Sequence, residues 1–307
     1  MPEKTASDAG LEGGDGAAVR LLGAAQMIDL HSHILWGIDD GARDLATSLE
    51  MARRFADQGV THVACTPHIL PGLYQNTGPQ IRAAVAALQT EIIQEGIPLT
   101  LVAGADNHIV PGFAAGLRDG RLLTLDDSKY VLVEPPHHVA PARMEDMFFE
   151  LLLAGYIPIL THPERLTWIE KQYDRVLTLA ARGVWMQVTS GSVRGAFGRR
   201  PKYWAERMLG EGLVHILASD AHNTTTRRPD LWDGFQAAER LVGKEEAWHL
   251  VAIRPWGILN RLNPTEQPAL PSAAVGRAQS GGRNAQSDSV GNSPGGNFAQ
   301  RLRRFFG

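Results

Sequence analysis

Seven short apolar runs that alternate with helical patterns constrain the fold of this chain most strongly. Each run is four or five residues long and nearly all apolar, as expected of a strand covered on both faces. The runs are residues 27–30, 62–65, 100–103, 130–133, 157–160, 184–188 and 214–217. Between them apolar residues recur at helical spacing, for example at Ile81, Val85 and Leu88. The alternation predicts an α/β fold of parallel strands joined by crossover helices, and its repeated units favour a barrel over an open sheet.

The strand–helix alternation occupies residues 26–264, and the segments on either side differ from it in composition. Residues 1–25 lack strong periodicity and are predicted to form a disordered leader. Residues 265–307 are rich in Pro, Ala, Ser, Gly, Asn and Gln, and hold too few apolar residues to offset the entropy of ordering. The last residues, 298–307, interleave Phe with Arg, which fits either a frayed end or a short docking helix.

Composition and charge exclude several classes of protein. The formal net charge of -3 does not indicate a nucleic-acid partner or a polycationic membrane binder. The single cysteine, Cys65, excludes an internal disulfide framework and fits a reducing compartment. No apolar run approaches the roughly 20 residues of a membrane span, and the N-terminus lacks a signal pattern. We therefore expect a cytoplasmic protein, at most peripheral to the membrane through a partner.

Metal-ligand residue types follow six of the seven expected strands. They are His31, His33 and Asp40 after the first strand, His68 after the second, Asp106 after the third, Glu134 after the fourth, His162 after the fifth, and Asp220 and His222 after the seventh. The carboxyl ends of parallel barrel strands open at one face, so these side chains are expected at one rim. His31-x-His33 and Asp220-x-His222 also have the two-residue period that points both side chains to one side of an extended chain.

Imidazoles and carboxylates together suit Mn, Fe or Zn, with Mg possible where carboxylates dominate. Each element alone has an ordinary explanation: Asp39-Asp40-Gly41 is typical of a turn, and His162 before Pro163 fits a hydrogen-bonded core histidine. Their shared position, strand after strand, indicates a metal site. We interpret His215 and His249 as structural, and His108, His137 and His138 lie near the rim without an assigned role.

Other catalytic schemes lack their defining residues. A cysteine-based phosphatase needs an arginine five residues after its thiolate, and Cys65 is not followed by one. The chain has no Gly-x-x-x-x-Gly-Lys-Ser/Thr phosphate loop, which argues against a kinase or ATPase, and no Gly-x-Ser-x-Gly nucleophile elbow. A metal-dependent hydrolase is the scheme that the residues support.

The ordered motifs, from His-x-His through Thr-Pro-His, Gly-Ala-Asp and His-Pro-Glu-Arg to Ser-Asp-x-His, resemble those of the polymerase and histidinol phosphatase (PHP) superfamily. Residues 27–41 and 214–223 are most similar to its bacterial manganese-dependent tyrosine-protein phosphatases of capsule and exopolysaccharide loci. The resemblance covers residues 27–264 and implies a distorted TIM-like barrel of seven β/α units. It also implies hydrolysis of phosphotyrosine on a protein, expected to be a bacterial tyrosine autokinase that controls capsule or exopolysaccharide synthesis.

The resemblance further implies up to three metal ions, with Mn²⁺ favoured and Fe, Zn or Mg as alternatives. One ion would be held by His31, His33, Glu134 and Asp220, a second by Asp106, Glu134 and His162 with Glu134 bridging, and a third by Asp40, His68 and His222. Arg165 and Arg228 would bind the phosphoryl group through their planar forks, and Asp220 or His222 would assist catalysis. Metal-bound water would supply the hydroxide nucleophile.

Some residues depart from the family pattern. Asp106 stands where many relatives have Glu, and Pro135-Pro136 directly follows Glu134. The paired Glu and later Arg with which some relatives build a ring are not evident around residues 46–48, so a homo-oligomer stays open. Two alternative functions also remain: a PHP hydrolase of a small phosphate ester such as histidinol phosphate or a nucleotide, and a non-catalytic regulator that binds a tyrosine kinase.

Overall fold

The computed structural model of this chain describes residues 26–271. The expected leader, residues 1–25, lies outside the described residues, and so does the chain from residue 272 onward, including the candidate docking segment 298–307. Within the described part, no helix is both long enough and apolar enough to cross a membrane.

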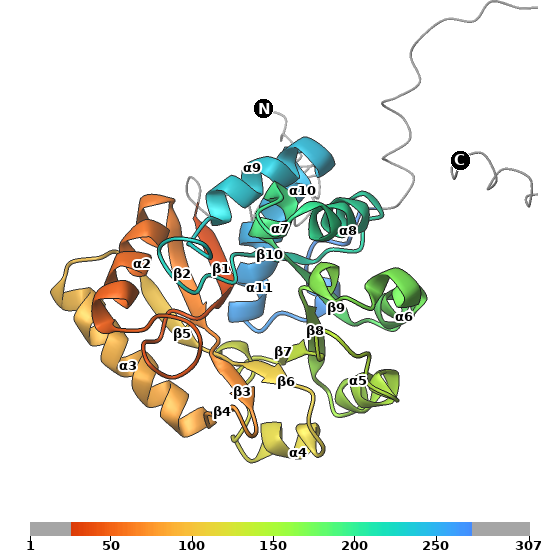
Figure 1. Cartoon of the computed structure of the whole chain (residues 1–307), viewed down its shortest axis with the longest axis horizontal. Helices are drawn as coiled ribbons and strands as arrows, with labels where there is room; N and C mark the ends of the chain where they lie inside the picture. The colour runs from red at the N-terminus through yellow and green to blue at the C-terminus, as the bar shows by residue number, and fades with distance from the viewer. Residues whose placement is uncertain (1–25, 272–307) are drawn as a thin grey trace, which may run out of the picture. The chain divides into compact units, whose positions relative to one another are not determined.

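The predicted strands are all present, and short extra strands continue two of them (Figure 1). Those that match the prediction are β1 (Met27–Ser32), β2 (Val60–Cys65), β5 (Thr100–Ala103), β7 (Tyr130–Glu134), β8 (Ile157–Thr161), β9 (Trp185–Thr189) and β10 (Ile216–Ala218). After β2 comes β3 (His68–Leu70), after β5 comes β6 (Asp106–His108), and β4 (Tyr74–Gln75) pairs antiparallel with β3. The other strand pairs of the described residues are parallel, as the alternation predicts.

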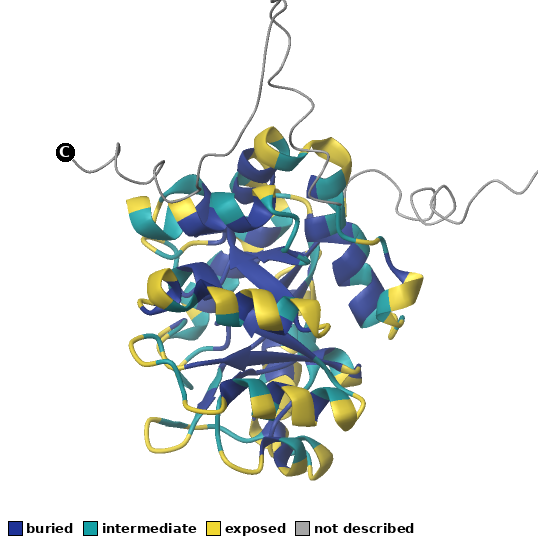
Figure 2. Ribbon diagram, turned by 90° about the vertical axis from the view of Figure 1, so that its right-hand side faces the viewer, coloured by how far each residue is buried: buried dark blue, intermediate teal, exposed yellow. Residues whose placement is uncertain are grey.

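Helices pack around the strands, most of them on the outside with buried inner and exposed outer faces (Figure 2), whereas Ile258 of the last helix belongs to the interior apolar cluster. They are α2 (Leu45–Asp57), α3 (Gly78–Gln94), α4 (Phe113–Arg118), α5 (Met144–Leu153), α6 (Ile169–Ala181), α7 (Ser190–Arg194), α8 (Arg199–Gly210), α9 (Leu231–Val242), α10 (Lys244–Trp248) and α11 (Arg254–Leu259). Asp44 caps α2 by accepting from the N–H of Thr47 (2.8 Å), and Thr77 and Gln80 form a capping box on α3. Helices on the outside leave the strands covered on both faces.

The strands form two sheets that meet at β1 and β10. Their orders are β1-β2-β5 and β10-β9-β8-β7-β6-β3-β4. The N–H of Asp220 donates to the carbonyl oxygen of His31 (2.9 Å), and that of His33 donates to Ala221 (2.8 Å). The barrel is irregular because the consecutive strands β5 and β6 belong to different sheets: β5 pairs with β2, whereas β6 pairs with β3 and β7. The prediction of an α/β fold built on a distorted barrel is confirmed.

Alternate residues of the strands fill the barrel interior and lead up to its rim. In β7, Tyr130 and Leu132 belong to the interior apolar cluster, whereas Val131 and Val133 pack with the outer core against the helices. The next interior-facing position is Glu134, at the carboxyl end of the strand. The period of two therefore places polar groups at the rim, directly above an apolar floor.

The packed domain extends past the end that the sequence predicts. The side-chain amide of the buried Gln267 donates to the hydroxyl of Tyr130 (2.6 Å). The guanidinium of Arg254, also buried, donates to the carbonyl oxygen of Ala269 (3.0 Å). Residues 265–271 thus join the domain by satisfying buried polar groups, which an apolar periodicity does not reveal.

Candidate metal centre

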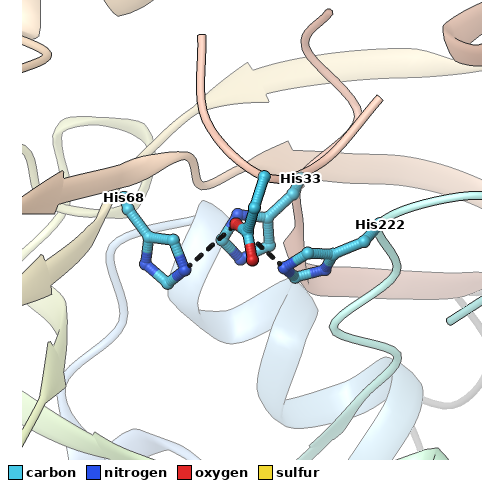
Figure 3. Close-up of side chains that lie close together, drawn as sticks. His33, His68 and His222 are labelled. Carbon is cyan, nitrogen blue, oxygen red and sulfur yellow. Dashed lines mark ion pairs between the residues drawn. The ribbon is translucent and has the colours of Figure 1, made fainter. Parts of the chain in front are cut away.

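The nine expected metal ligands gather at the rim formed by the carboxyl ends of the strands. They are His31 and His33 of β1 and its end, Asp40 of the following loop, His68 of β3, Asp106 of β6, Glu134 of β7, His162 after β8, and Asp220 and His222 after β10. Seven of them are buried, while Asp40 is exposed and His68 is half-buried. Figure 3 shows the rings of His33, His68 and His222 converging, although they come from distant parts of the chain.

The ligand atoms fall into groups close enough to share an ion. In each group, one atom from every residue lies within 4.8 Å of the others. Three groups consist of expected ligands: His33, Asp40, His68 and His222; His31, His33 and Asp220; and His31, Asp106 and His162. Two more surround Glu134: His68, His108 and Glu134; and Glu134, His137 and His162. The first group contains the trio that the resemblance implies for the third ion.

The remaining groups differ from the division that the resemblance implies. Asp106, rather than Glu134, is grouped with His31. Oδ2 of Asp106 lies 3.5 Å from Nε2 of His31 and 3.4 Å from Nδ1 of His68. The resemblance assigns His31 and His68 to different ions, and Asp106 lies between them. A carboxylate at this position could bridge two ions.

Several buried polar atoms of the cluster have no hydrogen-bond partner, which fits a set of cations. They are Oδ1 and Oδ2 of Asp106, Nδ1 of His162, Oδ1 of Asp220 and Nε2 of His222. Burying a carboxylate without a partner is costly unless a positive charge neutralises it. Nε2 of His33 lies 3.4 Å from Oδ1 of Asp220, and two ligands on one ion with bonds near 2.1 Å are expected about 3.0–3.4 Å apart. The donor set therefore fits divalent ions.

Hydrogen bonds to one ring nitrogen orient three of the imidazoles. Nδ1 of His31 donates to Oε1 of Gln187 (2.9 Å), Nδ1 of His33 to Oδ2 of Asp39 (2.7 Å), and Nδ1 of His222 to the carbonyl oxygen of Asp220 (3.0 Å). Such partners turn the other nitrogen toward the cluster and raise its basicity. Gln187 comes from β9, the strand to which sequence reasoning assigned no ligand. Its signal is the period of two after Trp185, which packs in the barrel interior.

His162 and Asp220 reach the cluster from strained backbone positions. Their φ angles are 32° and 52°, in the left-handed region that residues with a Cβ rarely adopt. Each lies just beyond the end of a strand, so the turn redirects its side chain. Strain of this kind costs about 1–3 kcal/mol and is concentrated at functional sites.

Opposite charges within the cluster shift the pKa values of its members. Burial alone would raise the pKa of Asp220, but Arg227 and His31 hold that pKa well below its usual range. Burial would lower the pKa of His31, but the neighbouring carboxylates, Asp220 foremost, raise it to about 9. Burial and the nearby Arg165 hold the pKa of His162 well below its usual range. Asp220 is therefore ionised and His162 neutral near neutral pH, the forms that bind a cation, whereas His31 would release a proton when it binds one.

Two arginines lie at the edge of the cluster, but only one of them is an expected residue. Arg165 and Arg227 both donate to Oδ2 of Asp220, Arg227 at 2.6 Å. Arg228, which the resemblance implies as a phosphate ligand, lies outside the cluster. Its side chain is 48% exposed and donates to Oδ2 of Asp233 (3.2 Å).

A turn at Asn223 determines which arginine faces the cluster. The side-chain oxygen of Asn223 accepts from the backbone N–H groups of residues 225–227 (2.9, 2.9 and 3.1 Å). The carbonyl oxygen of Arg227 accepts from the N–H of His222 (2.8 Å), so Arg227 is fixed beside a ligand while Arg228 turns outward. The sequence favours Arg228, next to Pro229, whereas Arg227 is the one that faces the cluster; the Asn-centred turn is the sequence signal that points to Arg227.

Barrels with a histidine and carboxylate cluster at the carboxyl rim form a broad class, the metal-dependent hydrolases, and the fold and centre of this chain are of that class. Within it, the chain belongs to the CpsB/CapC family of capsular polysaccharide synthesis, whose family model matches residues 27–260. That match spans every strand of the barrel and all nine expected ligands.

Several similar proteins carry the name tyrosine-protein phosphatase. YwqE of Bacillus subtilis (strain 168), a tyrosine-protein phosphatase, is 39% identical over 219 residues, which cover 71% of this chain and 86% of YwqE. CapC of Staphylococcus aureus, a putative tyrosine-protein phosphatase, is 31% identical over 201 residues, covering 66% and 79%. A crystal structure from work on YwqE and on CpsB of Streptococcus pneumoniae, described as unique metal-dependent tyrosine phosphatases, matches with a TM-score of 0.76 and 37% identity, over 80% of this chain and 99% of that one.

Proposed function

We propose that this chain is a metal-dependent protein-tyrosine phosphatase, a hydrolase of phosphoric monoesters. The observation that carries the proposal is the rim cluster of unpartnered carboxylate and imidazole atoms with Arg165 and Arg227 at its edge. Cations and guanidinium groups side by side suit a phosphoryl group, which carries its charge on several oxygens. The names of the relatives support phosphotyrosine as the substrate.

The residues that would hold the metal are the nine clustered ligands, as up to three Mn²⁺ ions. Fe and Zn also suit this mixture of nitrogen and oxygen ligands. When bound, the ions would supply positive charge to the phosphoryl oxygens and lower the pKa of water to near neutrality. Gln187 and Asp39 keep the rings of His31 and His33 aimed at the centre.

Arg165 and Arg227 would bind and orient the phosphoryl group. Both now donate to the same oxygen of Asp220, so a substrate oxygen can take over donors that already point into the centre. Their side chains are 16% and 24% exposed, so they are reachable from solvent. Phenolate is a relatively good leaving group, so a strong acid is not required, and Asp220 or His222 would assist proton transfer.

The protein substrate that fits this family is a phosphorylated bacterial tyrosine kinase of a capsule or exopolysaccharide system. A kinase anchored in the membrane would bring the phosphatase to the membrane from the cytoplasm. The single cysteine, Cys65, is buried and fits a reducing compartment.

The test combines metal analysis with substrate comparison on the full chain. Mn²⁺-loaded protein should hydrolyse phosphotyrosine peptide faster than histidinol phosphate or a nucleoside monophosphate, and His162→Ala should lose the activity. A preference for either small ester would overturn the tyrosine phosphatase assignment. Metal-independent turnover, or full activity of His162→Ala without metal, would overturn the role of the centre.

A further inference from the structure

Glu134 is held by two histidines that lie outside the nine expected ligands. Nε2 of His108 lies 2.6 Å from Oε2 of Glu134, and Nε2 of His137 lies 3.0 Å from Oε1. The Glu134 side chain is 5% exposed, while those of His108 and His137 are 15% and 29% exposed. The two rings therefore contact the carboxylate from the solvent side of the centre, one at each oxygen.

The distance separates the His108 contact from those among the expected ligands, while the His137 contact is a hydrogen bond to Oε1 of Glu134. Donor atoms of the expected ligands lie farther apart: 3.5 Å between His31 and Asp106, 3.4 Å between His33 and Asp220, and 3.6 Å between His162 and Glu134. Two ligands of one ion with bonds near 2.1 Å are expected about 3.0–3.4 Å apart at ordinary angles. A separation of 2.6 Å is too short for that and is typical of a charge-assisted hydrogen bond. His108 is thus placed to donate to Glu134 rather than to share its ion.

The fold places His108 by strand register. β6 and β7 are parallel neighbours in which His108 lies directly opposite Glu134, and Asp106 opposite Leu132. Asp106 and His108 are two residues apart, so both face the same side of β6. Asp106-x-His108 has the same two-residue spacing as His31-x-His33 and Asp220-x-His222 at the rim.

The loop after β7 places His137. Pro135 and Pro136 restrict the backbone at the turn, and the indole N–H of Trp168 donates to the carbonyl oxygen of Pro136 (3.0 Å). The N–H of Thr167 donates to the carbonyl oxygen of His137 (2.9 Å). The paired prolines thus belong to an anchored turn that brings His137 back onto Glu134.

We infer that His108 and His137 are positioning residues that fix the Glu134 carboxylate through both of its oxygens and thereby raise the metal affinity of the centre. Each carboxylate oxygen has two acceptor directions, so one remains for an ion after a histidine has donated to the other. Nothing in the family resemblance or in the relatives' names assigns these two residues. The inference rests on the proposed role of Glu134 as a metal ligand.

The experiment measures Mn²⁺ binding to the full chain without substrate, by calorimetric titration and by metal analysis after desalting. His108→Ala and His137→Ala should each weaken Mn²⁺ binding by about 10- to 100-fold, the usual effect of removing a residue that orients a metal ligand. His108→Gln should recover most of the affinity, because its amide nitrogen can donate near the position of Nε2. His138→Ala, a change to the exposed neighbouring histidine, serves as the matched control and should bind like the parent chain.

Two results would overturn the inference. One is unchanged Mn²⁺ affinity in both alanine variants. The other is the loss of a metal equivalent in His108→Ala and His108→Gln alike, since glutamine replaces a donor but not an imidazole ligand. Thermal melting of the metal-free variants identifies a folding defect, and if His108→Ala does not fold, His108→Gln and His137→Ala decide the question.

The inference and the proposed function can fail separately. A parent chain that binds Mn²⁺ with the expected variant pattern but does not hydrolyse phosphotyrosine contradicts the function alone. Normal phosphotyrosine turnover with unchanged Mn²⁺ affinity in the alanine variants contradicts the positioning role alone.

Discussion

Replacing Arg227 by alanine should lower activity on phosphotyrosine peptide far more than the same change at the next residue, Arg228. The two side chains are neighbours in sequence but have different surroundings. Arg227 is 24% exposed and donates to the buried Asp220 at 2.6 Å. Arg228 is 48% exposed and pairs with Asp233, which is 43% exposed.

The size of the difference follows from these surroundings. A hydrogen bond to a charged group contributes about 1.5–3 kcal/mol, so losing one such bond to the phosphoryl group in the transition state should lower kcat/KM by about 10- to 150-fold. An exposed ion pair contributes about 0–1 kcal/mol, so Arg228→Ala should alter stability by less than about 1 kcal/mol. Its kcat/KM should stay close to that of the parent chain, because its guanidinium does not face the centre.

The assay is initial-rate hydrolysis of phosphotyrosine peptide at saturating Mn²⁺, with melting curves to confirm folding. Arg227→Lys should give an intermediate rate, because lysine keeps the charge but not the planar fork. A larger loss in Arg228→Ala than in Arg227→Ala would refute the reasoning from the Asn223 turn and restore the arginine that the sequence alone suggested.

Three further predictions follow from buried contacts. Gln187→Leu removes the acceptor for Nδ1 of His31 and should weaken Mn²⁺ binding by about 10- to 100-fold, measured by titration, whereas an unchanged affinity would contradict the orienting role. Chelation of the metal should lower the melting temperature, and Mn²⁺ at about 100 times its Kd should restore about 2.7 kcal/mol of stability; a melting temperature indifferent to Mn²⁺ would argue against the centre. Burial, with Arg254 next, lowers the pKa of His215 from 6.5 to about 3. The unfolded chain therefore binds a proton at His215 more readily than the folded chain. The contribution of neutral His215 to the free energy of unfolding is present above pH 6.5 and is lost as the pH falls toward 3. In urea titrations of metal-free protein, the free energy of unfolding of His215→Asn should depend less on pH between 6.5 and 3. An identical pH dependence in both chains would contradict the role of His215.

The clustering of the candidate ligands could be predicted from the sequence, because each follows an apolar strand and the carboxyl ends of parallel strands meet at one rim. The residues that orient them could not be found in this way. Gln187 is recognisable only once β9 is known to face His31, and Arg227 only once the side chain of Asn223 is known to close a turn. Both depend on contacts between distant segments or on one loop conformation, and neither leaves a periodic signal.

The position of Asp106 shows why the grouping of the candidate ligands also required the structure. A carboxylate one methylene shorter than Glu reaches less far from its strand, which would place it at the margin of the centre. The chain, however, breaks its third strand and begins β6 at Asp106, whose N–H donates to the carbonyl oxygen of Pro67 (3.2 Å). From there its Oδ2 lies at similar distances from His31 and His68, 3.5 and 3.4 Å. Side-chain length and backbone path compensate for each other, so ligand identity read from a motif does not fix which ion a carboxylate serves.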